Sequence, residues 1–160
     1  MSDFTNFPNG ITIENGAHVA TLQAVEALPG AFTGSANARG DYDGTDNPTT
    51  LFTVTGKVLA LVFGKVTTDL AGASATIEVG ITGNTAAILA QQTGTDLDAG
   101  EIWTNDASAP LGTVGNFGEF VLLDGTDIIE TVATANLTGG VIEYTCLWYP
   151  LESGASVVAA

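Results

Sequence analysis

Apolar and polar residues alternate along most of the chain, which is the pattern of β-strands with one buried face. In Ser74–Thr82, every second residue from Ala75 to Ile81 is apolar, and the residues between them are polar or glycine. Ile142–Trp148 alternates in the same way, and Asp127–Thr134 also reads with a period of two. These segments predict antiparallel strands that are buried on one side.

Val58–Val66 differs, because both of its faces are apolar. We expect this strand to be covered on both sides or to lie near the middle of a sandwich. Further strands are predicted at Ile11–Glu14, Val19–Ala27, Leu51–Thr55 and Glu119–Leu123. Thr85–Gln92 is the one segment whose alanine and leucine content favours a helical turn.

Turn-forming pairs such as Asn9-Gly10, Gly83-Asn84 and Asp124-Gly125 separate these strands. Eight or more short strands with such turns predict an all-β fold, an antiparallel β-sandwich of jelly-roll type. A chain of 160 residues suits a single domain. We assign residues 17–160 to the sandwich and treat residues 1–16 as either an extended N-terminal arm or an edge strand.

Two segments between the predicted strands are expected to be loops. Gly34–Pro48 is rich in Gly, Asp and Asn, and we expect it to be long and exposed. Asp96–Pro110 is the second loop, but Ile102 and Trp103 indicate that it is held against the rest of the protein.

The charge is strongly unbalanced, with 18 acidic residues against 3 basic ones and a formal net charge of −15. A nucleic-acid surface needs several Lys or Arg residues against the phosphates, and this chain has only Arg39, Lys57 and Lys65. The same shortage argues against binding to anionic membranes. The acidity is explained by solubility, and the alternative is a surface that attracts cations or a basic partner.

Cys146 is the only cysteine, which leaves no partner for an internal disulfide, and we expect it to be a small buried apolar residue. No apolar run approaches the length of a membrane span, and the N-terminus lacks the pattern of a signal peptide. We therefore expect a protein that is made in a cytoplasm and stays there or leaves it inside a particle.

No sequence motif of an enzyme is present, so we expect a protein that is not an enzyme. His18 is the only histidine, and no nucleophile motif accompanies it. A carboxylate pair of the glycosidase kind stays open as an alternative, because the separation of two carboxylates is a three-dimensional quantity.

The strongest cluster of polar side chains is Asp41–Asn47. Asp41, Asp43, Asp46 and Asn47 supply the oxygen ligands that Ca²⁺ prefers, so Ca²⁺ is the one cofactor to consider. The spacing is not that of an EF-hand, and the alternative is a turn-rich loop whose Asp and Asn side chains bond to their own backbone. We favour the turn-rich loop.

An aromatic platform for a sugar could be formed by Trp103, Trp148 and Tyr149. Trp148 lies on the inward phase of its strand, which predicts a place in the core. Trp103, flanked by Glu101 and Thr104, is the better candidate for surface contact.

Three segments resemble a group of small structural proteins from tailed-phage virions. The F-P-N-G-V start of that group is similar to Phe7-Pro8-Asn9-Gly10-Ile11. A middle segment of the group is similar to Val79–Ala86. Its closing strand is similar to Gly139–Tyr144 through Trp148-Tyr149-Pro150-Leu151. Thr12-Ile13-Glu14 departs from the Ser-Phe-Gly that often follows the opening motif. The resemblance implies a β-sandwich or jelly roll that sits on a capsid or tail, commonly as an oligomer, and it implies no catalytic residues.

We therefore expect a virion structural protein, assembled in the host cytoplasm, and most of all a capsid decoration (cement) protein that binds the major capsid protein. The expected partners are copies of the chain itself, with a trimer favoured, and the capsid protein or another virion protein. Phe4, Phe7, Pro8 and Ile11 are the expected anchors of the arm on an apolar groove. The alternatives are a tail or fibre component of the virion and a carbohydrate-binding, adhesin-like β-sandwich.

Overall fold

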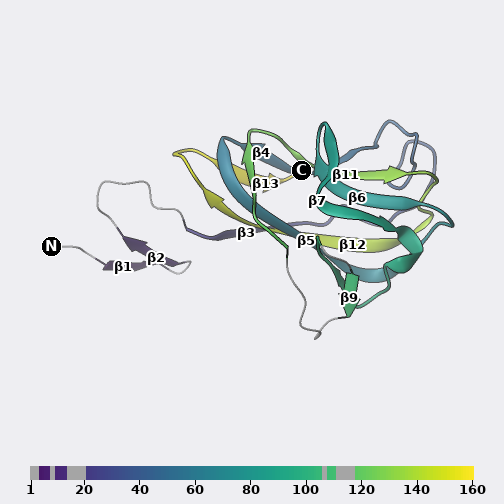
Figure 1. Cartoon of the computed structure of the whole chain (residues 1–160), viewed down its shortest axis with the longest axis horizontal. Coiled ribbons are helices and arrows are strands. Elements are labelled where there is room, and N and C mark those ends of the chain that lie inside the picture. Colours follow the sequence, from purple (N-terminus) through teal and green to yellow (C-terminus); the bar gives the residue numbers. More distant parts are fainter. Residues whose placement is uncertain (1–3, 8–9, 14–20, 106–107, 111–117) are drawn as a thin grey trace.

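In the computed structural model, the chain folds into two antiparallel β-sheets that pack face to face, as the alternating pattern predicted. The structure describes residues 4–7, 10–13, 21–105, 108–110 and 118–160. No α-helix occurs in these residues, and one 3₁₀ turn, η1 (Gly94–Asp96), follows β7. Figure 1 shows the two sheets lying one on the other. The expected all-β sandwich is confirmed.

The larger sheet has six strands, and its path runs β3-β12-β5-β8-β9. β8 and β10 pair with the same edge of β5: β10 with the first part of β5, and β8 with a later part. β12 therefore lies between β3 and β5. The strands are β3 (Gln23–Ala27), β5 (Lys57–Ala71), β8 (Glu101–Trp103), β9 (Ser108–Pro110), β10 (Val121–Asp124) and β12 (Gly139–Pro150).

The second sheet has five strands in the order β13-β4-β11-β6-β7. All of its neighbouring strands are antiparallel. The strands are β4 (Thr49–Thr55), β6 (Thr76–Ile81), β7 (Asn84–Thr93), β11 (Ile128–Ala133) and β13 (Ser156–Ala159).

The pairing of strands is nested about the β6–β7 hairpin. β6 pairs with β7, β5 with β10, β4 with β11, and β3 with β12, so each pair encloses the one before it in the sequence. Successive pairs fall in alternate sheets. The described strands therefore form an antiparallel sandwich with nested pairing, and the jelly-roll type stays a prediction from the sequence.

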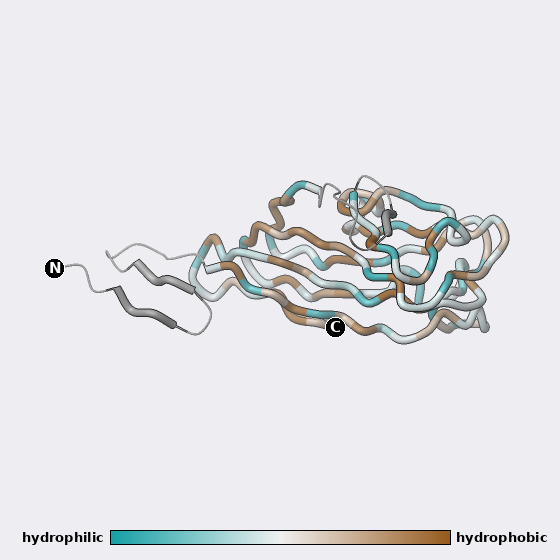
Figure 2. The backbone as a smooth tube through the Cα atoms, turned by 90° about the horizontal axis from the view of Figure 1, so that it is seen from below, coloured by the Kyte–Doolittle hydropathy of each residue, from teal (hydrophilic) through white to brown (hydrophobic). Residues whose placement is uncertain are grey.

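The core lies between the sheets and is built by the alternation along each strand. In β12, Ile142, Tyr144 and Cys146 are fully buried, and Trp148 is nearly so, while the residues between them are partly exposed. Ile77 and Val79 of β6 meet them from the other sheet as part of the same buried cluster. Figure 2 shows apolar segments running along the strands of the sandwich. Each such fully buried aliphatic side chain contributes about 1.5–3 kcal/mol to stability.

The expectation of a helical turn is wrong. Thr85–Gln92 was expected to favour a helical turn, but it lies within β7 and pairs with β6 along its length. Gly83, with φ of +90°, closes the tight turn between the two strands. Pairing and burial of Ile88 and Leu89 outweigh the helical preference of the alanines.

The N-terminal segment forms a small sheet of its own. β1 (Phe4–Phe7) pairs with β2 (Gly10–Ile13), with Phe4 opposite Ile13 and Phe7 opposite Gly10. Among the described strands, neither pairs with the two larger sheets, so β3 is the edge strand of the six-stranded sheet. The expected extended arm is a hairpin in its described part.

Candidate functional site

The outward side of the six-stranded sheet carries rows of apolar side chains. The register places Tyr149 of β12 beside Leu59 of β5, and Leu59 beside Leu122 of β10. In the next row, Leu147 pairs with Leu61. We call this surface the outer apolar face, and it consists of Leu59, Leu61, Phe120, Leu122, Leu147 and Tyr149.

These residues point away from the core because their neighbours along each strand point into it. Val58 and Ala60 of β5 are fully buried, and so is Cys146 of β12, while Leu59 and Leu147 between them are partly exposed. Leu122 is 67% exposed, next to the buried Leu123. The solvent side of an antiparallel sheet is normally polar. A contiguous apolar surface in this place is a feature of proteins that bind a partner.

Two members of the outer apolar face cover part of it. The rings of Phe120 and Tyr149 pack with their centroids 5.9 Å apart and tilted by 46°. Leu61, at the centre, is only 7% exposed, whereas Phe120 remains 40% exposed. The two-faced pattern of Val58–Val66 predicted a strand that is covered on both sides or lies near the middle of a sandwich. β5 does lie inside its sheet, between β12 on one side and β10 and β8 on the other, and within one chain its outer side is covered only in part.

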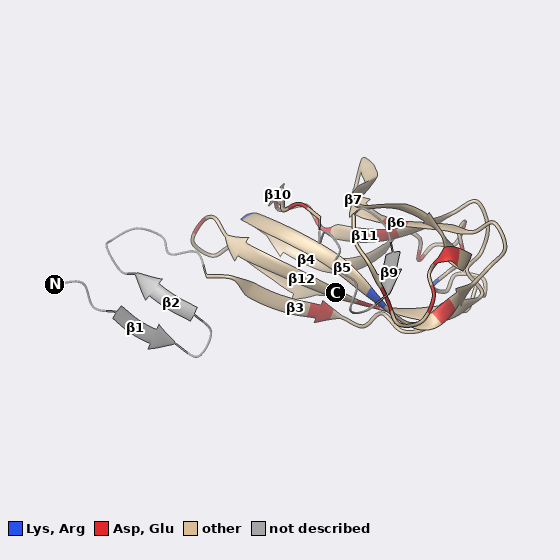
Figure 3. Cartoon of the chain, turned by 60° about the horizontal axis from the view of Figure 1, so that its bottom comes forward, with Lys and Arg blue, Asp and Glu red and all other residues tan. Residues whose placement is uncertain are grey.

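Both exposed cations of the chain lie at the ends of this surface. Lys57 and Lys65 occupy the same face of β5 as Leu59 and Leu61, one at each end of the apolar run. The Lys57 ammonium lies 3.3 Å from a Glu152 carboxylate oxygen and 3.6 Å from one of Asp124. Figure 3 shows how few segments of the chain carry Lys or Arg.

The lysines at the two ends are held by carboxylates. The hydrogen bond to Glu152, together with the charges of Asp124 and Glu152, raises the pKa of Lys57. Hydrogen bonds from the backbone and side chain of Lys57 lower the pKa of Glu152 in return. At the other end, Lys65 lies 3.7 Å from Glu143. The rim therefore carries paired charges, and the centre of the outer apolar face carries none.

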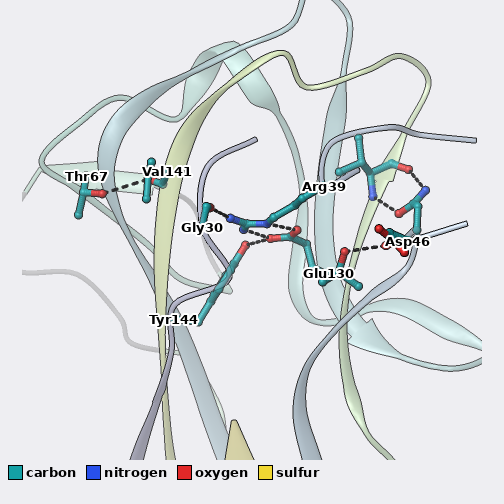
Figure 4. A network of polar contacts seen from close by, with 10 residues as sticks. Gly30, Arg39, Asp46, Thr67, Glu130, Val141 and Tyr144 are labelled. Atoms are coloured by element: carbon teal, nitrogen blue, oxygen red, sulfur yellow. Dashed lines mark hydrogen bonds and ion pairs between the residues drawn. The ribbon is translucent and has the colours of Figure 1, made fainter. Parts of the chain in front are cut away.

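The third cation, Arg39, belongs to a buried network that connects both sheets. Its Nε and Nη2 donate to the two oxygens of Glu130 on β11, at 2.9 and 2.6 Å. The hydroxyl of Tyr144 on β12 donates to the same carboxylate at 2.6 Å. Arg39 also donates to the carbonyl of Gly30, and its guanidinium lies 3.8 Å from the centre of the Phe32 ring. Figure 4 shows Arg39, Glu130, Tyr144 and Gly30 pointing toward one another.

Burial and charge act against each other in this network. Burial lowers the pKa of Arg39, but the charge and hydrogen bonds of Glu130 outweigh it, so the net shift is upward. Burial, followed by the charge of Glu130, raises the pKa of Tyr144 well above its usual range. Glu130 and Tyr144 are each 1% exposed or less. A carboxylate so enclosed and so fully bonded serves to hold the loop before β4 onto both sheets.

The expected calcium ligands in Asp41–Asn47 are used in other contacts or are exposed to solvent. The Asp41 carboxylate is mostly buried and accepts the backbone N–H of Asn37 at 2.8 Å. The Asn47 side chain donates to the Val132 carbonyl at 2.8 Å and accepts the Val132 N–H at 3.0 Å. Asp43 and Asp46 are exposed. Among the residues that the structure describes, no three His, Cys, Asp or Glu side chains form a group able to hold a metal ion.

The expectation that Trp103 contacts partners at the surface is wrong. Trp103 is fully buried in β8, with its ring 6.4 Å from that of Tyr144. Pairing of β8 with Gly64 and Lys65 of β5 turns the side chain inward, and Gly64 has no side chain to compete for the space. Asp96–Pro110 was expected to be a loop, but its described residues include β8 and β9. The burial of Trp103 agrees with the expectation that Ile102 and Trp103 hold this segment against the rest of the protein. It also removes the stacking residue from the carbohydrate-binding alternative.

The expected anchors of the N-terminal arm are only partly placed. Phe4 and Phe7 lie in β1, and Ile11 lies in β2. Pro8 lies outside the described residues, and so does His18.

Two functional features were not singled out from the sequence. The outer apolar face was signalled only by the two-faced pattern of Val58–Val66, because the partners of that strand depend on the topology. Glu130 lies on the inward phase of its strand, and in the sequence only this position indicated a buried carboxylate. Nothing in the sequence indicated that Arg39, 91 residues away, would meet it.

Comparison with known proteins gives no match to a protein-family model, to a curated protein or to a solved structure. Within the described part of the chain, no helix is long and apolar enough to cross a membrane.

Proposed function

We propose that this protein is a structural subunit of a tailed-phage virion that binds the capsid as a decoration protein. The observation that supports the proposal best is the outer apolar face, which offers contact area where a free-standing sandwich would carry polar side chains. The resemblance of three segments to virion structural proteins points to the same class.

The rest of the described surface suits a protein that is covered by neighbours. Charged residues make up only 13% of the chain, and short polar side chains take their place. Such side chains lose little conformational entropy when a partner covers them. The buried Arg39–Glu130 pair, in turn, holds a long loop rigid, which reduces the entropy that assembly would cost.

The partner that we propose for the N-terminal segment is the major capsid protein. Phe4, Phe7, Pro8 and Ile11 are apolar residues within eight positions of each other, so they can anchor the segment in a groove. A two-stranded hairpin is marginally stable by itself, and binding to another surface would complete it.

The test is binding of the purified protein to capsids that lack it. Full-length protein is expected to saturate the capsid surface, and a variant without Ser2–Asn9 is expected to show lower occupancy. Unchanged occupancy of the shortened variant would contradict the role of the arm. Binding to tails and not to heads in electron micrographs would identify a tail or fibre component instead, and binding to neither would contradict the proposal.

A further inference from the structure

We propose that the bond between Asp43 and Gly44 is a site of spontaneous covalent modification, at which the aspartate rearranges to isoaspartate through a cyclic imide. The site lies in the long loop before β4. The inference does not depend on the proposed function, because the reaction needs no partner protein.

The reaction uses only the two residues and water. The backbone nitrogen of Gly44 attacks Cγ of Asp43 in its neutral acid form, so a C–N bond forms, and the amide proton leaves with the carboxyl OH as water. The product is a five-membered imide, whose closure is fast because both reacting groups belong to the same short segment. Water then adds to a ring carbonyl and breaks one C–N bond. When the main-chain bond breaks, the chain continues through the former side chain, with the mass unchanged and no oxidant or reductant used.

The carboxylate of Asp43 is free to react. Its side chain is exposed, and within the described part of the chain it takes part in no hydrogen bond or ion pair. Asp41, in contrast, is mostly buried and accepts the backbone N–H of Asn37 at 2.8 Å. Asp43 therefore has no contact to break before its Cγ approaches the next backbone nitrogen.

The attacking nitrogen is held only weakly. The N–H of Gly44 points to the carbonyl of Asp41 at 3.4 Å, which is longer than the usual range of about 2.7–3.2 Å for such a bond. Gly44 also has no Cβ atom to shield the nitrogen. A Cβ atom there would lie 2.7 Å from a carboxylate oxygen of Asp41, so the fold itself favours glycine at this position.

The chain contains a matched reference for this bond, because the sequence Asp-Gly-Thr-Asp occurs at residues 43–46 and again at residues 124–127. The N–H of Gly125 donates to the carbonyl of Gly56 at 2.9 Å. Asp124 ends β10, pairs with Lys57 in the sheet, and has its carboxylate 3.6 Å from the Lys57 ammonium. These contacts must break before the second imide can close. The two bonds have the same local sequence, and the structure protects only the second.

The rearrangement would lengthen a segment that is fixed at both ends. Before Asp43, Arg39 bonds to Glu130 of β11. After it, the side chain of Asn47 bonds to the N–H and the carbonyl of Val132 on the same strand. The extra backbone atom of isoaspartate therefore falls within the loop that connects the two sheets.

The positions of the basic residues make the test direct. Trypsin cleaves after Arg39, Lys57 and Lys65, so Asp43-Gly44 falls in the peptide of residues 40–57 and Asp124-Gly125 in that of residues 66–160. Both Asn-Gly pairs of the chain fall in residues 1–39, and their deamidation is recognised by its change in mass.

The folded, full-length protein is incubated in mildly acidic buffer and digested beside an unincubated sample. Electron-transfer fragmentation locates isoaspartate in each peptide, and methylation by protein isoaspartate methyltransferase measures its amount. Isoaspartate is expected at position 43 with no change in mass, and it should form at least about tenfold faster there than at position 124. In urea, where the contact of Gly125 is lost, the two bonds should react at similar rates.

Asp43→Glu is the control variant, since it keeps the exposed carboxylate but would have to close a six-membered ring. Its peptide of residues 40–57 should contain no isomer, which separates Asp43 from Asp41 and Asp46 as the source. No isoaspartate at position 43 of the wild type, or equal rates at positions 43 and 124 in the folded protein, would overturn the inference. A rate difference that persists in urea would also overturn it, because the fold would then not be its cause.

Discussion

Arg39 shows how one residue can connect elements that are far apart in the sequence. It comes from the long loop before β4, and its partners Glu130 and Tyr144 lie on different sheets. Removing one member of such a buried pair leaves the other charge without compensation, which costs far more than the intact pair contributes. The stability of the fold therefore depends on all members of this network being present together.

Replacing Arg39 by methionine should lower the free energy of unfolding by about 3–5 kcal/mol, because the Glu130 carboxylate stays buried without its cation. Urea unfolding measures this loss. Lys65→Met is the matched control, since its ion pair with Glu143 is exposed and should add little. Equal losses in the two variants would contradict the structural role of Arg39.

Cys146 should make the protein lose stability at high pH. Burial raises the pKa of its thiol from 9.0 to about 12. The folded state therefore keeps a proton that the unfolded chain releases, so stability is complete below about pH 9 and falls as the pH rises toward 12. In urea unfolding between about pH 8 and 11, Cys146→Ala should show a shallower fall than the wild type, by up to about 1.4 kcal/mol per pH unit. Parallel slopes would show that Cys146 does not contribute.

Strands were predicted from the sequence where one face is buried, because burial imposes the alternation directly. Ile142–Trp148 was found in this way and lies within β12, and Ser74–Thr82 was found in this way and contains β6. β7 was missed because its alanines and leucine read equally well as a helix, and only pairing with β6 decides between the two. Trp103 was misplaced for a similar reason, since its polar neighbours carry no information about the space beside Gly64.

In the long loop before β4, the backbone at Gly40 approaches the backbone at Leu137 closely, and this close approach can be tested. Gly40, with φ of +99°, lies against the carbonyl of Leu137, where a Cβ atom would clash. Gly83, with φ of +90°, turns between β6 and β7 and has open space around it. Gly83→Ala should cost about 1–2 kcal/mol for the backbone conformation alone. Gly40→Ala should cost about 1–3 kcal/mol more because of the clash, as thermal or urea unfolding would show, and equal costs would argue against the close approach.

The charge of the protein acts over longer distances than any of these contacts. Eighteen carboxylates against three cations leave an acidic surface that repels itself within one folded chain and between chains. The two exposed lysines at the ends of the outer apolar face reduce this repulsion locally. The sequence gives the total charge, but only the fold shows that its exposed cations lie on one strand.

Salt should therefore stabilise the protein. Raising NaCl from about 0.01 to 0.15 M shortens the screening length from about 30 to 8 Å and should raise the melting temperature by about 2–4 °C.

Calcium chloride at the same ionic strength should stabilise the protein no more than magnesium chloride does, because Asp41 and Asn47 already have partners. A large effect specific to calcium would restore the cation site in Asp41–Asn47.

The nested order of the strands also constrains how the protein is made on the ribosome. The β6–β7 hairpin is complete once residue 93 has emerged, and it needs no later part of the chain. β3, in contrast, can join its sheet only after β12 has been synthesised, about 120 residues later, because β12 separates it from β5. Until then Ala27 of β3, which is buried in the folded protein, and the partly buried Val25 stay uncovered and open to misassociation. A nascent chain of this protein should therefore depend on protection by a chaperone until its last strands are released.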